Sequence, residues 1–331
     1  MKLATIEKIH SIQPHPNPEV NRLSVAKIKQ WPVVIGKEQF KENELVVFIQ
    51  IDSIVPETPV FEFMRKQQFR VWSARFKGAP SQGLVMPLSI LPPNIYAEGD
   101  DVTDVIGVTK YERPIDVSIG GDAKGEFPKN VISITDELNA LNFPEAFMEL
   151  QDGQPLAITL KWDGSSTTYI AQDNEFHACS RRLEMEEGSG FPWTLANKYN
   201  LKERMLALNT NIAIQCEAVG PKLNGNRAKL KDMELRLFRA KNLNTGSHYN
   251  LSQLQDLGRM LSIPVVDLLQ VVEYNKNIHT IEWFADVANN VKWPTTGEVA
   301  EGIVIAPVVP FYSQTLGKMW SVKIINICYK Q

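Results

Sequence analysis

The residue pattern of this chain changes about a third of the way along, and that change most limits what it can fold into. Residues 1 to about 105 read as short strands and turns: 23–28 alternates, and 44–49 is strongly β-prone. Prolines punctuate this part throughout. After about residue 131, strand-like and helix-like segments are mixed. A chain of 331 residues is also long for one hydrophobic core, so two domains are predicted.

The proposed boundaries follow from these patterns. Residues 1–105 should form a small β-barrel, the natural solution for many short strands. Residues 106–130 carry Gly107, Pro114, Gly120 and Gly121 with little periodicity and should form a linker. Residues 131–331 should form the second domain, with strands at 156–160, 212–216, 235–238, 302–305 and 320–325 and helices at about 250–261 and 281–290. Asn250 should cap the first of these helices.

Composition excludes some classes of protein and leaves others open. No apolar run approaches the ~20 residues of a membrane helix, and the N-terminus lacks the apolar core of a secretory signal. Three cysteines without metal-binding spacing indicate reduced thiols and an intracellular, cytoplasmic protein. The net charge of −3 argues mildly against a nucleic-acid binder, although a local basic patch is enough to hold phosphates.

Two stretches of the chain contain no acidic residue. The first, Met64 to Ala97, interleaves basic residues with Phe69, Trp72 and Phe76, and the second runs from Ala218 to Lys231. Each could be an ordinary solvated face, or a groove that neutralises a nucleic-acid backbone and stacks its bases. The candidate nucleic-acid contacts are Arg65, Lys66, Arg70, Arg75, Lys77, Lys222 and Arg227.

Residues with catalytic potential follow the predicted strands of the second domain. Lys161-Trp162-Asp163-Gly164 comes directly after the first strand and, taken alone, could be a charged hairpin turn. Five further segments lie at strands in order: Ser180-Arg181, Glu217 to Gly220, Leu237-Phe238, Glu301 to Val304 and Val322-Lys323. By pattern alone, Phe238 would be a core side chain and the charged residues would be surface groups.

This ordered set resembles the covalent nucleotidyltransferases, which include polynucleotide ligases and mRNA-capping enzymes. Ser166 stands where DNA ligases and capping enzymes typically have an arginine, and Ser180 to Glu184 is similar to a motif of the phage RNA ligase 2 family. Glu217 to Pro221, followed by Asn224-Gly225-Asn226, has the RNA ligase form of the third motif. His15 to Pro18 resembles the opening of tRNA-binding-type OB modules, and an OB module before the transferase domain resembles the Naegleria-type RNA ligases.

The resemblance implies an α+β protein with an N-terminal OB-like β-barrel and an ATP-grasp-like ligase domain of antiparallel sheets flanked by helices. It implies an ATP-dependent RNA ligase that joins 3′-OH and 5′-phosphate ends through lysyl-AMP and RNA-adenylate intermediates. We expect a monomer that acts on nicked duplex RNA. DNA ligation, mRNA-capping-type transfer and a non-enzymatic OB-fold RNA-binding protein remain alternatives.

Residue roles carry over by position. Lys161 would be the nucleophile, with Asp163, Arg181 and Lys323 completing the catalytic set, and Gly164, Glu217, Phe238, Glu301 and Val304 completing the ATP pocket. Asp163 and Glu301 would hold a divalent metal, Mg or Mn, through water. Burial and the nearby cations Arg181 and Lys323 should lower the pKa of Lys161.

One departure from the phage pattern concerns the last motif. The phage enzyme has K-x-K, whereas here Lys323-Ile324-Ile325 lacks the second lysine. Lys318 and Lys330 are the candidate substitutes.

Overall fold

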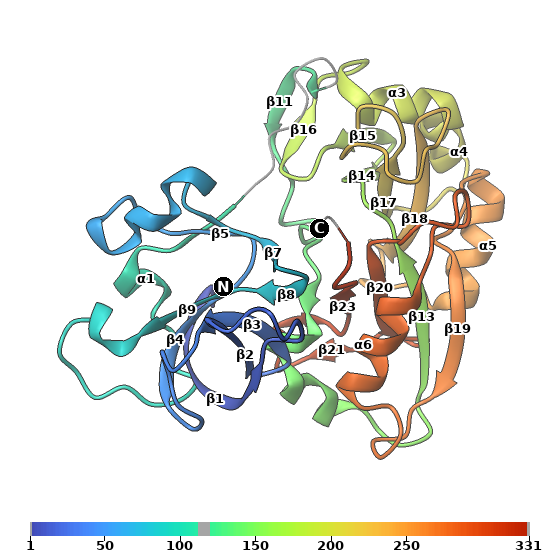
Figure 1. Cartoon of the computed structure of the whole chain (residues 1–331). Coiled ribbons are helices and arrows are strands. Elements are labelled where there is room, and N and C mark those ends of the chain that lie inside the picture. The colour runs from blue at the N-terminus through green and yellow to red at the C-terminus, as the bar shows by residue number, and fades with distance from the viewer. Residues whose placement is uncertain (1, 112–119, 330–331) are drawn as a thin grey trace. The chain divides into compact units, whose positions relative to one another are not determined.

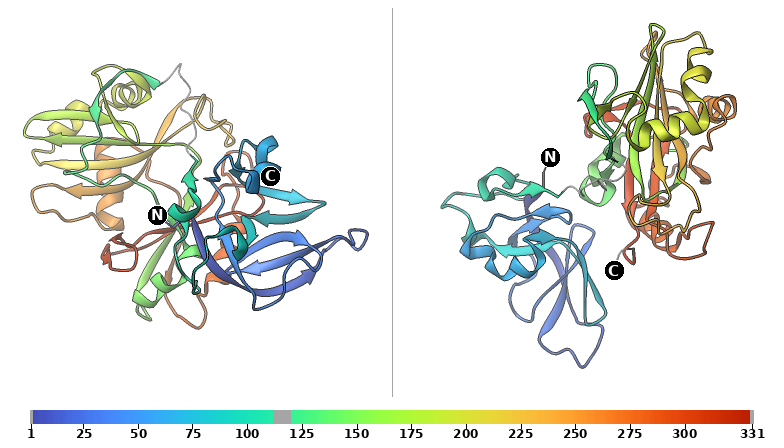
Figure 2. Two further views of the ribbon diagram at one scale, coloured as in Figure 1. Left: turned by 90° about the vertical axis from the view of Figure 1, so that its left-hand side faces the viewer. Right: turned by 90° about the horizontal axis from the view of Figure 1, so that it is seen from above.

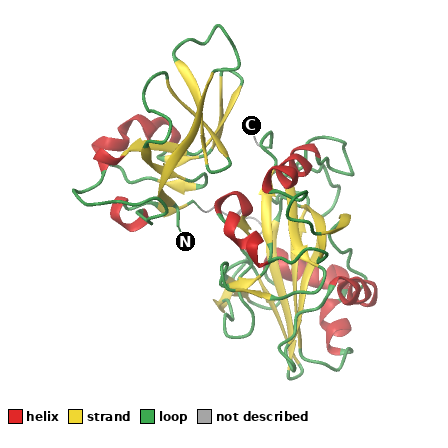
Figure 3. Cartoon of the chain, turned by 90° about the horizontal axis from the view of Figure 1, so that it is seen from below, coloured by secondary structure: helices red, strands yellow, loops and turns green. Residues whose placement is uncertain are grey.

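The computed structural model describes residues 2–111 and 120–329, and these two ranges form two compact units (Figure 1). Pro114 of the expected linker and the candidate Lys330 lie outside the described residues. In both units strands form the interior and helices lie at the periphery (Figure 3). No helix in the described ranges is long and apolar enough to cross a membrane.

Within the described residues, the first unit is built on a five-stranded antiparallel sheet. Its strand order is β3 (Trp31–Gly36), β2 (Leu23–Ile28), β1 (Ala4–Pro14), β4 (Leu45–Ile49) and β9 (Leu84–Pro87). The register of β1 shifts between Ile9 and Ser11, so its first half pairs with β4 and its second half with β2. Such a shift bends a strand and lets one sheet curl towards a barrel.

Smaller elements complete the first unit. These are β5 (Ser53–Ile54), β6 (Arg70–Val71), β10 (Thr109–Lys110), the hairpin β7 (Ser73–Phe76) and β8 (Ala79–Gln82), the 3₁₀ helices η1 (Pro59–Gln67) and η2 (Leu88–Ile90), and α1 (Thr103–Ile106). The core gathers alternate residues of β1 and β4, such as Ile6 and Val47, with Phe61 and Phe69. The side-chain period of two in a strand makes this alternation possible.

The larger sheet of the second unit has six strands in the described range. Their order is β11 (Ala123–Glu126), β16 (Leu183–Met185), β15 (Glu175–Cys179), β14 (Ser165–Gln172), β17 (Ile212–Val219) and β18 (Glu234–Asn242). Helices α3 (Gly190–Tyr199), α4 (Leu201–Leu206) and α5 (Leu251–Leu261) pack on one face of this sheet (Figure 1). On the opposite face, Ile170, Cys179 and Ala213 pack against Phe127 and Ile132.

A second, five-stranded sheet completes this unit (Figure 2). Its order is β12 (Leu138–Asn139), β23 (Val322–Ile325), β20 (Gly302–Pro307), β13 (Pro155–Lys161) and β19 (Leu268–Glu273), and only β12 and β23 pair in parallel among the described strands. Helix α6 (Ile281–Asn290) packs beside it, with η3 (Ala140–Asn142), η4 (Pro144–Glu149) and the hairpin β21 (Tyr312–Ser313) and β22 (Lys318–Met319).

The predicted helices are confirmed. Asn250 caps α5 in a complete capping box with Gln253, and α6 covers the predicted 281–290. The expected linker differs from the structure at both ends, because Thr109–Lys110 pairs with β5 and Ala123–Glu126 pairs with β16. These short strands have little pattern of their own and exist because distant strands supply their hydrogen-bonding partners.

Candidate active site

Lys161 ends strand β13, directly opposite Gly302 on β20. Its Nζ donates a hydrogen bond to Oε2 of Glu301 at 2.8 Å, and the two side chains are 20% and 12% exposed. Gly302 has a φ of +147°, and a Cβ there would lie 2.1 Å from the carbonyl oxygen of Ile324. Glycine therefore lets β20 pass close to β23 and places Glu301 beside the lysine.

The charge environment of Lys161 differs from the expectation. Burial acts to lower the pKa of Lys161, but the carboxylates of Glu301, Glu217 and Asp163 outweigh it and raise the pKa above its ordinary value. The prediction that Arg181 and Lys323 lower this pKa is wrong for the free protein. Both cations face a different carboxylate, Asp136.

The loop after Lys161 packs tightly against β17. The Gly164 N–H donates to Oε1 of Glu217 at 3.1 Å. A Cβ on Gly164 would meet the carbonyl oxygen of Ala218 at 2.1 Å, so a larger residue cannot occupy this position without moving the backbone. Burial raises the pKa of Glu217 to about 7, with Lys161 acting against this rise and Glu301 and Asp163 adding to it.

Asp163 is 8% exposed, and both of its carboxylate oxygens accept hydrogen bonds. Asn224 donates to Oδ1 at 3.1 Å, and the Tyr329 hydroxyl donates to Oδ2 at 2.6 Å. Asn224 also donates to the Gly164 carbonyl. Trp162, the residue before Asp163, is buried, and its indole N–H donates a hydrogen bond to the Asp267 carboxylate. The loop that carries Asp163 is therefore held on both sides.

Arg181 and Lys323 come together on Asp136. Arg181 Nη2 lies 3.2 Å from Oδ2 of Asp136, and Lys323 Nζ lies 3.9 Å from Oδ1. Arg181 follows β15 of the larger sheet, whereas Lys323 is on β23 of the smaller one. Asp136 thus joins cations from the two sheets.

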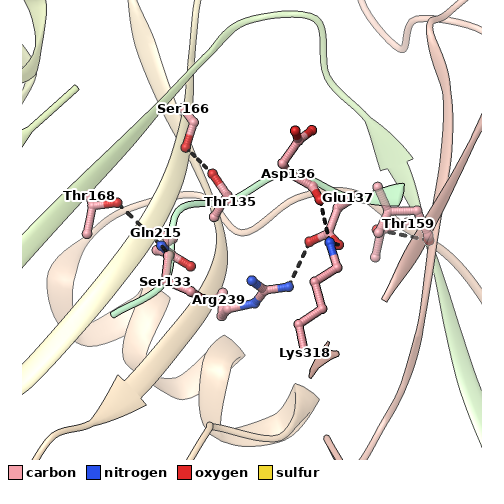
Figure 4. Close-up of polar contacts among 11 residues, drawn as sticks. Ser133, Thr135, Asp136, Glu137, Thr159, Ser166, Thr168, Gln215, Arg239 and Lys318 are labelled. Carbon is pink, nitrogen blue, oxygen red and sulfur yellow. Dashed lines mark hydrogen bonds and ion pairs between the residues drawn. The ribbon is translucent and has the colours of Figure 1, made fainter. Parts of the chain in front are cut away.

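Sequence reasoning missed residues 133–137, which we call the strap. The backbone oxygen of Ser133 accepts from Gln215 at 2.9 Å, Thr135 shares a hydrogen bond with Ser166, and Glu137 accepts from Arg239 at 2.7 Å (Figure 4). Each of these contacts is with the larger sheet. The strap has only five residues, too few to establish a helical or strand-like period, so no pattern in the sequence marks it.

The candidate substitute Lys318 lies against the strap. Its amine donates to the Asp136 carbonyl and lies 3.5 Å from Oε2 of Glu137 (Figure 4). Burial lowers the pKa of Lys318 despite the attraction of Glu137. Lys318 is therefore next to the group that holds Arg181 and Lys323.

Phe238 and Val304 lie on strands of the two sheets. Leu235 and Leu237 of β18 belong to the buried core, whereas Phe238 is half-buried and lies where the register between β17 and β18 shifts. Val304 on β20 is paired with Lys323 of β23 and with Thr159 of β13. Phe238 is therefore not one of the fully buried side chains of this core.

Two of the candidate nucleic-acid contacts in the first unit, Arg65 and Arg70, form ion pairs with acidic residues from outside their own segment. Arg65 lies 2.6 Å from Glu62 and 3.5 Å from Glu57, and Arg70 lies 2.6 Å from Asp52. These acids lie outside the acid-free stretch. The remaining candidates there, Lys66, Arg75 and Lys77, are exposed.

The three aromatic residues of that stretch divide into two kinds. Trp72 and Phe76 are each 47% exposed, but Phe69 is 4% exposed and belongs to the core. Gln68 and Phe69 both adopt positive φ, at 53° and 58°, and this turn directs Phe69 inward. Phe69 is therefore not available for stacking on a base.

The carboxylates around Lys161 are the oxygen groups that a hard divalent cation prefers. In residues 2–111 and 120–329, no three His, Cys, Asp or Glu side chains are close enough to ligate one ion together. Asp163 and Glu301 already accept hydrogen bonds from Tyr329, Asn224 and Lys161. The donor chemistry thus fits a metal held through its waters rather than by a direct cage.

Two family models match this chain. An OB-fold domain model matches residues 3–88, and an RNA ligase model matches residues 154–324, just over half of the chain. A search of curated proteins found no match. The OB-fold match agrees with the bent five-stranded sheet of the first unit.

Solved structures of Naegleria gruberi RNA ligase resemble the whole chain at 30% sequence identity. A mutant without ligand has a TM-score of 0.85, covering 99% of this chain and 97% of that one. A mutant with AMP and Mn has a TM-score of 0.85, and the ligase with pyrophosphate 0.84, each covering 99% of this chain and 98% of the other. The expected order of the two folds is confirmed, and the chain belongs to the RNA ligase family.

Proposed function

We propose that this protein is an ATP-dependent RNA ligase that joins 3′-OH and 5′-phosphate ends through an AMP adduct on Lys161. The observation that carries the proposal is the position of the Lys161 amine at a strand end, 2.8 Å from Glu301 and within the electrostatic influence of Glu217 and Asp163. The relatives solved with ATP and Mn, and with AMP and Mn, support the nucleotide and a divalent metal, Mg or Mn.

The chemistry begins at Lys161. Its neutral amine attacks the α-phosphorus of ATP, an N–P bond forms, and the P–O bond to pyrophosphate breaks. The amine must first lose a proton, which the raised pKa of Lys161 opposes in the free protein. A divalent cation, when bound, supplies positive charge that neutralises the phosphates and orients the leaving group. Asp163 and Glu301 would hold it through water.

The other side chains bind and orient the nucleotide. Arg181 and Lys323 exchange the Asp136 carboxylate for phosphate oxygens, with Lys318 nearby. Glu217 accepts from the ribose hydroxyls, and Phe238 stacks on adenine beside Val304. The AMP then passes to the 5′-phosphate of one RNA strand, and the 3′-OH of the other strand attacks that phosphate and expels AMP.

We further propose that the substrate is nicked duplex RNA and that the protein binds it as a monomer in the cytoplasm. The hairpin β7–β8 and its flanks present the exposed Trp72 and Phe76 beside the exposed Arg75 and Lys77. A nucleic-acid strand is bound by aromatic side chains that stack on its bases and by cations that neutralise its phosphates. In the second unit, the candidate RNA contacts Lys222 and Arg227 are also exposed.

Incubation with radiolabelled ATP or GTP tests the reaction. ATP should label the wild-type protein, and Lys161→Met should abolish the label while its melting temperature confirms that it folds. Labelling by GTP would indicate a capping-type enzyme, and an adduct on Lys161→Met would refute the assignment of the nucleophile. The absence of any label would favour the RNA-binding protein without activity.

A matched panel of nicked RNA, nicked DNA and single strands tests the substrate. Reversal of charge at Arg75 and Lys77 should weaken sealing and leave ATP labelling intact, because labelling needs only the second unit. Reversal at Lys37 and Lys41, which are exposed elsewhere in the first unit, provides the control. Equal effects of the two pairs would contradict the assigned surface.

A further inference from the structure

We propose that Tyr329 is a positioning residue that fixes the orientation of the Asp163 carboxylate, an inference that rests on the proposed function. The tyrosine hydroxyl donates to Oδ2 of Asp163 at 2.6 Å. Tyr329 is 4% exposed and Asp163 is 8% exposed, so water competes little for this bond. Charge-assisted hydrogen bonds of this length are among the stronger ones in proteins.

The carboxylate is held from two sides. A carboxylate rotates easily about its last torsion, so a single hydrogen bond leaves its plane poorly defined. Asn224, from the loop after β17, donates to Oδ1 at 3.1 Å, and Tyr329 follows β23. Donors from two separate segments therefore fix both oxygens and leave the remaining lone pairs of Asp163 in a defined direction.

Tyr329 is itself located by packing. Its ring lies 6.1 Å from the ring of Trp293 at an interplanar angle of 71°, and the Arg227 guanidinium lies 5.0 Å from its centroid. The same buried cluster contains Leu160 and Ala300, the residues directly before Lys161 and Glu301. The phenol thus shares one rigid support with the reactive lysine and its partner acid.

The Tyr329 hydroxyl is the donor in this hydrogen bond, because an ionised carboxylate can only accept. Loss of this partner would free Asp163 to rotate, and removing the partner of a metal-orienting group typically costs about 10- to 100-fold in metal affinity or activity.

The test compares Tyr329→Phe with Tyr169→Phe. Tyr169 is a matched control, because it is fully buried in the same unit and its hydroxyl donates to the Pro192 carbonyl at 2.9 Å. Intact mass measures the rate of AMP addition over a titration of MnCl2. Tyr329→Phe should need about 10- to 100-fold more Mn²⁺ for half-maximal rate, whereas Tyr169→Phe should titrate like wild type.

A binding measurement tests the same point without catalysis. In a Lys161→Met background, the rise in melting temperature caused by MnCl2 with ATP should be smaller for Tyr329→Phe than for Tyr169→Phe. Asn224→Ala, which frees the other oxygen, should move both readouts in the same direction as Tyr329→Phe. This second variant keeps the test valid if Tyr329→Phe folds poorly.

Several results would overturn the inference. An unchanged Mn²⁺ requirement in both Tyr329→Phe and Asn224→Ala would do so, as would a loss of rate that only follows the amount of folded protein. Failure of the wild-type protein to label with ATP would refute the proposed function instead. The melting experiment decides the role of Tyr329 in either case, because it does not depend on labelling.

Discussion

The ion pair between Glu137 and Arg239 offers a quantitative test of the strap. Oε1 of Glu137 lies 2.7 Å from Nη2 of Arg239, and the side chains are only 14% and 15% exposed. Glu137→Gln keeps the shape of the side chain but leaves the charge of Arg239 without its counter-ion. Removing one member of a buried pair typically costs about 3–5 kcal/mol, and the remaining exposure reduces our expectation to about 2–4 kcal/mol.

An exposed pair in the same unit provides the control. Lys229 and Glu298 lie 2.5 Å apart, but their side chains are 64% and 55% exposed. Water and salt screen such a pair, so Glu298→Gln should cost about 0–1 kcal/mol. The two substitutions are chemically identical, but Glu137 is the more buried acid and also lies 3.5 Å from Lys318.

Thermal unfolding followed by tryptophan fluorescence measures both effects. For a unit of this size, about 2–4 kcal/mol corresponds to a decrease in melting temperature of roughly 4–16 °C. The double substitution Glu137→Leu with Arg239→Met should recover most of the loss, because apolar residues of similar volume can replace a buried pair. Equal decreases for Glu137→Gln and Glu298→Gln would refute the view that the strap is held by a buried charge.

Three other substitutions test separate parts of the structure. Gly164→Ala should abolish AMP addition, measured by intact mass, because its Cβ would meet the Ala218 carbonyl at 2.1 Å; full activity would contradict this packing. Arg181→Ala should raise the ATP concentration needed for half-maximal labelling about tenfold, from the loss of one charge-assisted contact, and an unchanged requirement would place Arg181 outside the pocket. His248→Gln should reduce the loss of unfolding free energy between pH 7 and pH 5. Burial lowers the pKa of His248 to about 4, with Arg239 and Lys241 adding to the effect, so stability falls as pH drops below about 6.5. Between pH 7 and pH 5 this contribution is at most about 2 kcal/mol, because solvent screens a partly exposed group, and denaturant titrations that show identical pH dependence in both proteins would exclude it.

The sequence predicted those parts of the fold that repeat a local pattern. Helix α5 has a leucine stripe and a capping residue, and β13, β17 and β20 are apolar runs long enough to recognise. The short strands β10, β11 and β12 were not predicted, because two to four residues contain too little periodicity. Their pairing depends on partners far away in the sequence.

The site shows the same division. Motif order located Lys161 and Glu301, which the structure places in hydrogen-bonding contact. It did not locate Asp136, Glu137 or Tyr329, whose roles come from contacts across more than 40 residues of sequence. The direction of the pKa shift of Lys161 could not be predicted from the sequence either. Burial lowers this pKa and three nearby acids raise it, and their distances from the lysine are known only from the structure.

The two groups of charges in the pocket are held with different strength, and this difference suggests an order of events. Asp136 faces Arg181 and Lys323, which are 40% and 27% exposed, so water screens these pairs and they are worth about 0–1 kcal/mol each. The several charges of a triphosphate can therefore replace Asp136 at little cost. The pair of Lys161 and Glu301 is less exposed, at 20% and 12%, and further acids keep the lysine protonated. In the mechanism that we propose, the phosphates can therefore bind to the free protein, whereas activation of Lys161 requires additional positive charge near Glu301 and Asp163.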